Sequence, residues 1–110
     1  MNQTDSTDSK LAHNVFFSLK DASDDAVQRL IDDCFSYLRE HEGVLFFSAG
    51  RLVSEHQRDV NDRDFEVGLH IIFTHKKTHD DYQAAPRHDE FIERNRENWA
   101  KVRVFDTYVM

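Results

Sequence analysis

The sequence of 110 residues is poor in cysteine and has no long apolar run. Its single cysteine, Cys34, cannot form a disulfide within the chain, and it falls on the apolar face of an expected helix. That position favours a buried core thiol over a nucleophile. No apolar run approaches the roughly 20 residues that cross a bilayer, and residues 1–10 have no apolar stretch typical of a secretory signal. We therefore expect a cytoplasmic protein.

Positive charge is also scarce, because 14 Lys and Arg stand against 21 Asp and Glu, for a net charge of −7. Such a surface repels phosphate backbones and anionic lipid, so we expect neither nucleic acid nor a membrane as a partner. Hydrophobic residues make up 39% of the chain and include nine Phe, which is enough for one packed core at this length. Residues 1–10 show no periodicity, so we expect a flexible tail followed by one domain over 11–110.

Apolar side chains recur with two different periods along the chain. Alternation predicts four strands, over 12–19, 44–53, 65–74 and 102–109. Helical spacing predicts a helix over 24–41, which Ser23 caps and Gly43 ends. Between the second and third strands, 54–64 is a polar loop in which Val60 is the one core candidate.

A second helical stretch is interrupted by the single proline. It should begin at Thr78 and break before Pro86, which suits the first turn of a new helix reaching about Asn98. The resulting order, β-α-β-β-α-β, is the ferredoxin-like arrangement of the α+β class: a four-stranded antiparallel sheet with the helices on one face. Bulky apolar residues occupy both sides of several strands, so the other face also needs cover. A second copy of the sheet would supply it, which predicts a homodimer through the sheet faces.

Three stretches of the chain are similar to one known family. These are HNVFFSLK in the first strand (13–20), DYQAAPRH at the helix break (81–88), and VFD in the last strand (104–106), followed by Tyr108. Over 11–109 the chain resembles the stress-responsive dimeric α/β-barrel domain (Dabb). It departs from the family pattern at Ala85, where a histidine is common, and in the long, charged loop 54–64.

The resemblance implies a homodimer whose sheets face each other to close a barrel, with a cavity in each subunit between sheet and helices. Members include plant stress-induced proteins with no assigned reaction and a plant polyketide cyclase, whose matching tyrosine and histidine do the chemistry. In this chain those residues are Tyr82 and His88, and His13 could point into the same space from the first strand. A histidine can remove a proton alpha to a carbonyl, and a phenol can donate a hydrogen bond to the developing oxyanion.

A structural role for Tyr82 and His88 is the alternative that we favour from the sequence: hydrogen bonds from both would hold the helix break against the sheet. Four nearby residues resemble metal ligands, namely His75, His79, Asp80 and Asp81. With Thr78 as the helix cap, however, the two histidines do not share a helix face, and the acids favour a helix N-terminus. We therefore expect a solvated turn there, with no metal and no cofactor.

Three functions are compatible with these residues. The first is a non-catalytic dimer that binds a small apolar molecule in the cavity. The second is a polyketide-cyclase-like or isomerase enzyme with His88 as base and Tyr82 as hydrogen-bond donor; an open apolar cavity on which His13 also converges would favour it. The third is a cofactor-free monooxygenase of related barrel shape, which would use Asn14, Trp99 and a histidine around an aromatic substrate, although we expect Trp99 in the core at the end of a helix.

Overall fold

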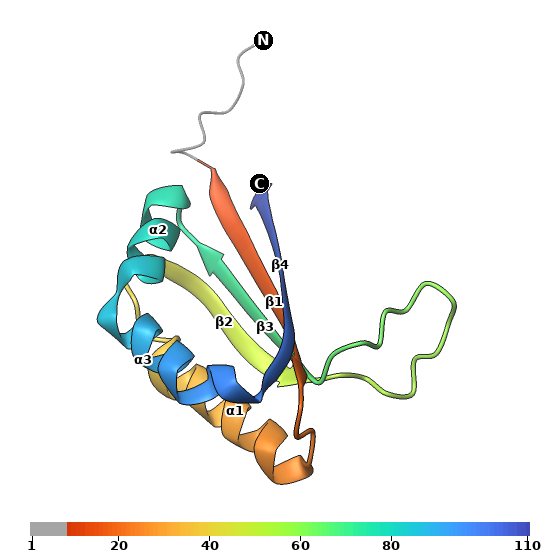
Figure 1. Ribbon diagram of the computed structural model, residues 1–110. Helices are drawn as coiled ribbons and strands as arrows, with labels where there is room; N and C mark the ends of the chain where they lie inside the picture. The colour runs from red at the N-terminus through yellow and green to blue at the C-terminus, as the bar shows by residue number, and fades with distance from the viewer. Residues whose placement is uncertain (1–8) are drawn as a thin grey trace.

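The computed structural model describes residues 9–110, which form one four-stranded sheet with helices on a single face (Figure 1). The strand order is β2-β3-β1-β4, and every neighbouring pair is antiparallel. The elements in chain order are β1 (Lys10–Leu19), α1 (Asp24–Tyr37), β2 (Val44–Arg51), β3 (Val67–Phe73), α2 (Lys76–Ala84), α3 (Pro86–Asn95), a 3₁₀ turn η1 (Arg96–Asn98) and β4 (Trp99–Val109). The predicted ferredoxin-like α+β class is confirmed.

The predicted tail, 1–10, lies outside the described residues except for its last two positions. Lys10 already belongs to β1, where it pairs with Val109 of β4. No helix in the described part of the chain is long and apolar enough to cross a membrane.

Helix α1 begins as predicted and ends early. The Ser23 hydroxyl accepts a hydrogen bond (3.3 Å) from a backbone N–H of the first turn. The last helical residue is Tyr37, whose carbonyl lies 2.9 Å from the His41 ring nitrogen Nε2, so a side chain occupies the place of a further helical turn. Gly43 therefore lies beyond the helix, in the turn before β2, with φ of 87°. A side chain there would also collide with Thr78.

The second helical stretch begins earlier than predicted and breaks where predicted. His75 is the N-cap of α2, and the hydroxyl of Thr78 accepts a hydrogen bond (3.4 Å) from the His75 backbone N–H, so Thr78 lies inside the helix. Pro86 opens α3 at its first position. The helix does not reach residue 98, because η1 follows it. Trp99 begins β4 and is not the end of a helix, which corrects its predicted place.

The core lies between the sheet and the helices. Alternate residues of β1 and β3 face the helices and are buried: Leu11, Val15, Phe17, Leu19, Val67, Leu69, Ile71 and Phe73. Cys34 of α1 is fully buried among them, as predicted. Val60, the one core candidate of the polar loop, is 85% exposed and lies outside the core. The segment 52–66 that carries it extends away from the sheet (Figure 1).

The sheet face opposite the helices carries aromatic side chains. The Phe16 ring lies 4.9 Å from that of Phe65 and 5.8 Å from that of Phe105, measured between ring centroids. Phe105 and Phe46 remain 51% and 54% exposed. Within the described residues, no helix covers this face (Figure 1).

Candidate functional site

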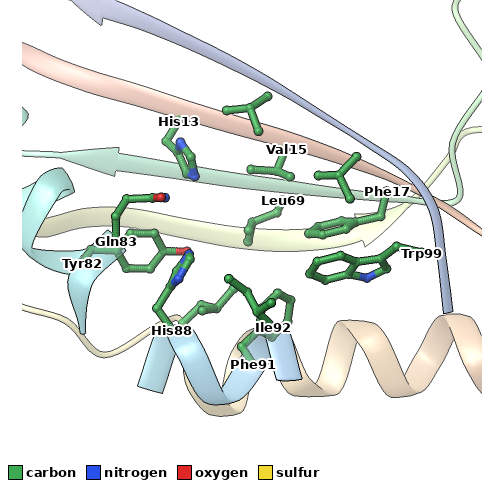
Figure 2. Close-up of a pocket in the computed structure, with 13 residues that line it drawn as sticks. His13, Val15, Phe17, Leu69, Tyr82, Gln83, His88, Phe91, Ile92 and Trp99 are labelled. Atoms are coloured by element: carbon green, nitrogen blue, oxygen red, sulfur yellow. The ribbon is translucent and has the colours of Figure 1, made fainter. Parts of the chain in front are cut away.

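A pocket of about 190 Å³ lies between the sheet and helices α2 and α3 (Figure 2). Most of its wall is apolar, and its polar side chains are those of His13, Tyr82, Gln83 and His88. The pocket opens beside β4, because Val102 and Val104 face the helix layer and yet stay 38% and 50% exposed. The remaining lining residues are Val15, Phe17, Leu38, Leu69, Phe91, Ile92 and Trp99.

Three elements bring the predicted site residues together. His13 is at a helix-facing position of β1, Tyr82 is near the end of α2, and His88 is in the first turn of α3. The break at Pro86 turns the last two toward each other, with ring centroids 4.9 Å apart, and the rings of His13 and Tyr82 are 5.9 Å apart. Figure 2 shows the three side chains on one side of the pocket, with apolar residues filling the other.

Hydrogen bonds from Tyr82 and His88 do not hold the helix break, so the structural role that we favoured from the sequence is wrong on this point. Within residues 9–110, neither the Tyr82 hydroxyl nor the His88 ring has a hydrogen-bond partner, and the His88 Nδ1 atom is buried. The break is held by the backbone instead. The N–H of Ala85 donates to the Tyr82 carbonyl (3.2 Å), and those of His88 and Asp89 donate to the Ala85 carbonyl (3.0 and 3.2 Å).

Burial sets the protonation of both pocket groups. It lowers the pKa of His88 below its ordinary value of 6.5, against the opposite effect of Asp89. It raises the pKa of Tyr82 above its ordinary value of 10, because the phenolate form loses its hydration. At neutral pH the site therefore presents a neutral imidazole beside a protonated phenol. These are the forms that a general base and a hydrogen-bond donor require.

Further polar residues surround this pair, and the sequence did not predict them as site residues. The His13 Nδ1 atom lies 2.6 Å from Asp106 Oδ1, across the pairing of β1 with β4. Burial lowers the pKa of His13, and the Asp106 carboxylate acts in the opposite direction. The rings of His41 and His79 lie 5.1 and 6.4 Å from that of Tyr82. Strand register was the missing signal, because it places Asp106 opposite His13.

The whole domain matches one family. The profile of the stress-responsive A/B barrel domain, Dabb, matches residues 11–109. The chain belongs to this family. A search of curated proteins found no match.

Solved structures share the fold of this Dabb chain. A Dabb family protein with a ferredoxin-like fold from Mesorhizobium loti is 23% identical (TM-score 0.77; 93% of this chain and 98% of that one). A dimeric ferredoxin-like protein of unknown function from Thermobifida fusca is 11% identical (TM-score 0.77; 99% of each chain). Hydroxynitrile lyase from Passiflora edulis is 17% identical (TM-score 0.75; 94% and 95%). At these identities the likeness shows the fold and not a shared activity.

The four residues that resemble metal ligands in the sequence do not form one site in this Dabb domain; they are His75, His79, Asp80 and Asp81. Asp80 and Asp81 lie in the second turn of α2 and not at its start, and they pair with Lys76 (2.6 Å) and Lys77 (3.0 Å). His79 faces another way, with its ring 4.8 Å from that of His13. Asp80 and Asp81 are therefore exposed to solvent, whereas the His79 ring packs with those of His13 and Tyr82.

The residues of the monooxygenase alternative lie on opposite faces of the sheet. Asn14 Oδ1 lies 2.8 Å from the His70 ring on the face away from the helices. Trp99 lines the pocket on the helix side, 5.2 Å from the Phe17 ring. Asn14 and Trp99 therefore do not share the pocket, and the geometry does not support this alternative.

Proposed function

We propose that this Dabb protein binds a small, largely apolar carbonyl compound in the pocket and moves a proton on it. The observation that carries the proposal is the pair of His88, whose buried Nδ1 has no hydrogen-bond partner within residues 9–110, and the Tyr82 phenol, which both line an open apolar pocket. Apolar walls would hold the hydrocarbon part of the ligand, and the few polar groups would fix its orientation.

His88 is the proposed base. A neutral imidazole with a lowered pKa has its lone pair available at neutral pH, and a proton alpha to a carbonyl is acidic enough to be removed with the help of such a base. The free ring also has room for a ligand contact, because no hydrogen bond within the described chain has to break first.

Tyr82 is the proposed hydrogen-bond donor. Removal of the alpha proton moves negative charge to the carbonyl oxygen, and a phenol placed beside that oxygen stabilises the enolate. Because burial raises the pKa of Tyr82, the phenol keeps its proton while it donates. A compound with several carbonyl groups at β positions, as the cyclase resemblance implies, offers both an acidic proton and an oxygen for this contact.

His13 is the third predicted site residue, and we give it a positioning role. It is 3% exposed, its Nδ1 is occupied by Asp106, and its ring packs edge-on against that of Tyr82. This contact fixes where the phenol lies relative to His88. The proposal assigns no proton transfer to His13.

We also propose that the chain is a homodimer through the sheet faces. The uncovered face presents Phe16, Phe46 and Phe105, and a second copy would bury them. Two of the solved structures with this fold, from Thermobifida fusca and Bacteroides fragilis, are described as dimeric. The cytoplasmic location and the absence of a cofactor stay predictions.

Binding of an aromatic β-keto ester, ethyl benzoylacetate, tests the proposal. Trp99 is the single tryptophan and lines the pocket, so its indole N–H gives one NMR signal that reports on occupancy. We expect a saturable shift of this signal, and about tenfold weaker binding in both His88→Ala and Tyr82→Phe, because each loses one hydrogen bond to the ligand.

Matched controls are His56→Ala in the exposed loop and Tyr108→Phe, which lies outside the pocket. Both should bind like the parent. A shift that does not saturate, or equal affinity in all five proteins, would contradict the assignment of the pocket.

A further inference from the structure

Three side chains from separate elements converge beside the pocket. His13 comes from β1, His79 from the first half of α2, and Asp106 from β4. One ligand atom from each lies within 4.8 Å of the other two. His13 Nδ1 and Asp106 Oδ1 are already 2.6 Å apart, and the rings of His13 and His79 are 4.8 Å apart.

His79 has one satisfied and one unsatisfied nitrogen. Its Nδ1 lies 3.1 Å from Asp80 Oδ1, whereas its Nε2 is buried and has no partner within residues 9–110. The side chain is only 14% exposed, so water has little access to it. A buried nitrogen without a partner is costly, and the cost disappears when the nitrogen gains a ligand.

We propose that His13, His79 and Asp106 bind a divalent first-row transition metal such as Zn²⁺. Two imidazoles and one carboxylate are donors that this ion accepts in tetrahedral sites with one open position. The metal would stand in place of the proton shared between His13 and Asp106 and would satisfy His79 Nε2. It would bind whether or not the pocket takes up a carbonyl compound.

Neighbouring residues suit such an ion. Asp80 holds the far nitrogen of His79, as carboxylates commonly do behind metal-binding histidines. Lys76 is the nearby cation, and its charge is engaged by Asp80 at 2.6 Å. A second cavity of about 190 Å³, lined by His79, Asp106 and Tyr108 among others, gives an entry path and room for water at the open position.

Geometry leaves two adjustments to make. With metal bonds of about 2.0–2.2 Å, the donor atoms of a tetrahedral site lie about 3.3–3.6 Å apart. His79 must therefore move closer than 4.8 Å, and it lies on the short surface helix α2. His13 Nδ1 and Asp106 Oδ1 must move apart from 2.6 Å, which rotation of the partly exposed Asp106 side chain allows.

Equilibrium dialysis of the chain, without an oligohistidine tag, against Zn²⁺ and against Co²⁺ tests the site. We expect one metal ion per chain, and visible d–d absorption from bound Co²⁺ with the intensity of a four-coordinate complex. His79→Ala and Asp106→Asn should each weaken binding at least tenfold. Asp106→Asn keeps the shape of the side chain, and circular dichroism checks that both variants remain folded.

The matched control is His56→Ala, which removes one exposed histidine from the loop and should bind metal like the parent. A parent that takes up no stoichiometric metal would overturn the proposal. So would binding that survives in both His79→Ala and Asp106→Asn, because the metal would then lie elsewhere on the chain.

Discussion

Burial shifts the pKa of three side chains in and beside the pocket, those of Cys34, Tyr82 and His88. It raises the pKa of Cys34 to about 12, and this thiol is fully enclosed and is not among the residues that line the pocket. It raises the pKa of Tyr82 and lowers that of His88 by the same loss of hydration. Only the last two face the open pocket. A shifted pKa becomes useful at these two residues because a ligand can reach them.

The two pocket groups also differ in what they contribute to stability. The Tyr82 ring is 2% exposed and contacts the rings of Phe73, His41 and His88, so it is a core residue as well as a hydrogen-bond donor. His88 is less buried and makes no ring hydrogen bond within the described chain. For this reason Tyr82→Phe, which keeps the ring, is the appropriate change at the first position, whereas His88 can be truncated.

At the scale of elements, one buried carboxylate joins the two long helices. Asp33 of α1 accepts hydrogen bonds from Arg94 Nε (3.0 Å) and from the Asn95 side chain (3.0 Å), both on α3. Asp33 and Asn95 are 7% and 8% exposed. Because α3 carries His88, this contact also fixes one wall of the pocket.

Asp33→Ala should lower the free energy of unfolding by on the order of 1–3 kcal/mol, because it removes the acceptor of one of the two N–H groups of the buried Asn95 amide, while the other still donates to the Phe91 carbonyl. The control is Asp32→Ala, at an exposed neighbour whose side chain accepts one hydrogen bond within residues 9–110, from Gln28. It should change stability by less than about 0.5 kcal/mol. Urea titration measures both, and equal losses in the two variants would show that Asp33 does not join the helices as described.

Periodicity predicted the elements of this fold, and local capping chemistry explains where their ends differ. The alternation over 12–19 and 65–74 predicted two strands, and β1 and β3 lie there, with one set of alternate residues facing the helices. Pro86 placed the break correctly. The end of α1 and the start of α2 were missed because the His41 ring meets the Tyr37 carbonyl and His75 occupies the N-cap position, and histidine is not among the residues usually found at helix ends.

The site was only partly predictable, because some of its contacts depend on how the elements pack in three dimensions. Tyr82, His88 and His13 came from the family resemblance, and the structure brings them together. Asp106 and His79 were missed as members of the cluster, because their contacts with His13 depend on strand register and on the first turn of α2. Neither can be obtained from the spacing of residues in one sequence.

At the scale of the whole molecule, the uncovered sheet face predicts self-association. Sedimentation velocity at micromolar concentration should give twice the chain mass of 13.0 kDa. Phe105→Lys would place a charge on the exposed aromatic face and should shift the equilibrium toward the monomer. Ala84→Lys, which adds the same charge at an exposed position of α2 in the helix layer, serves as a control. A parent that sediments only as a monomer at these concentrations would contradict the dimer.

Proton exchange tests the proposed function most directly. In D₂O, the parent should accelerate loss of the alpha proton of ethyl benzoylacetate over the buffer rate, followed by ¹H NMR. We expect His88→Ala to be slower by a factor of about 10² or more. Because the pKa of His88 is lowered, the parent's rate should fall to half of its plateau at a pH below 6.5, the ordinary pKa of histidine. Equal rates in the parent and His88→Ala, with both proteins folded, would contradict the account.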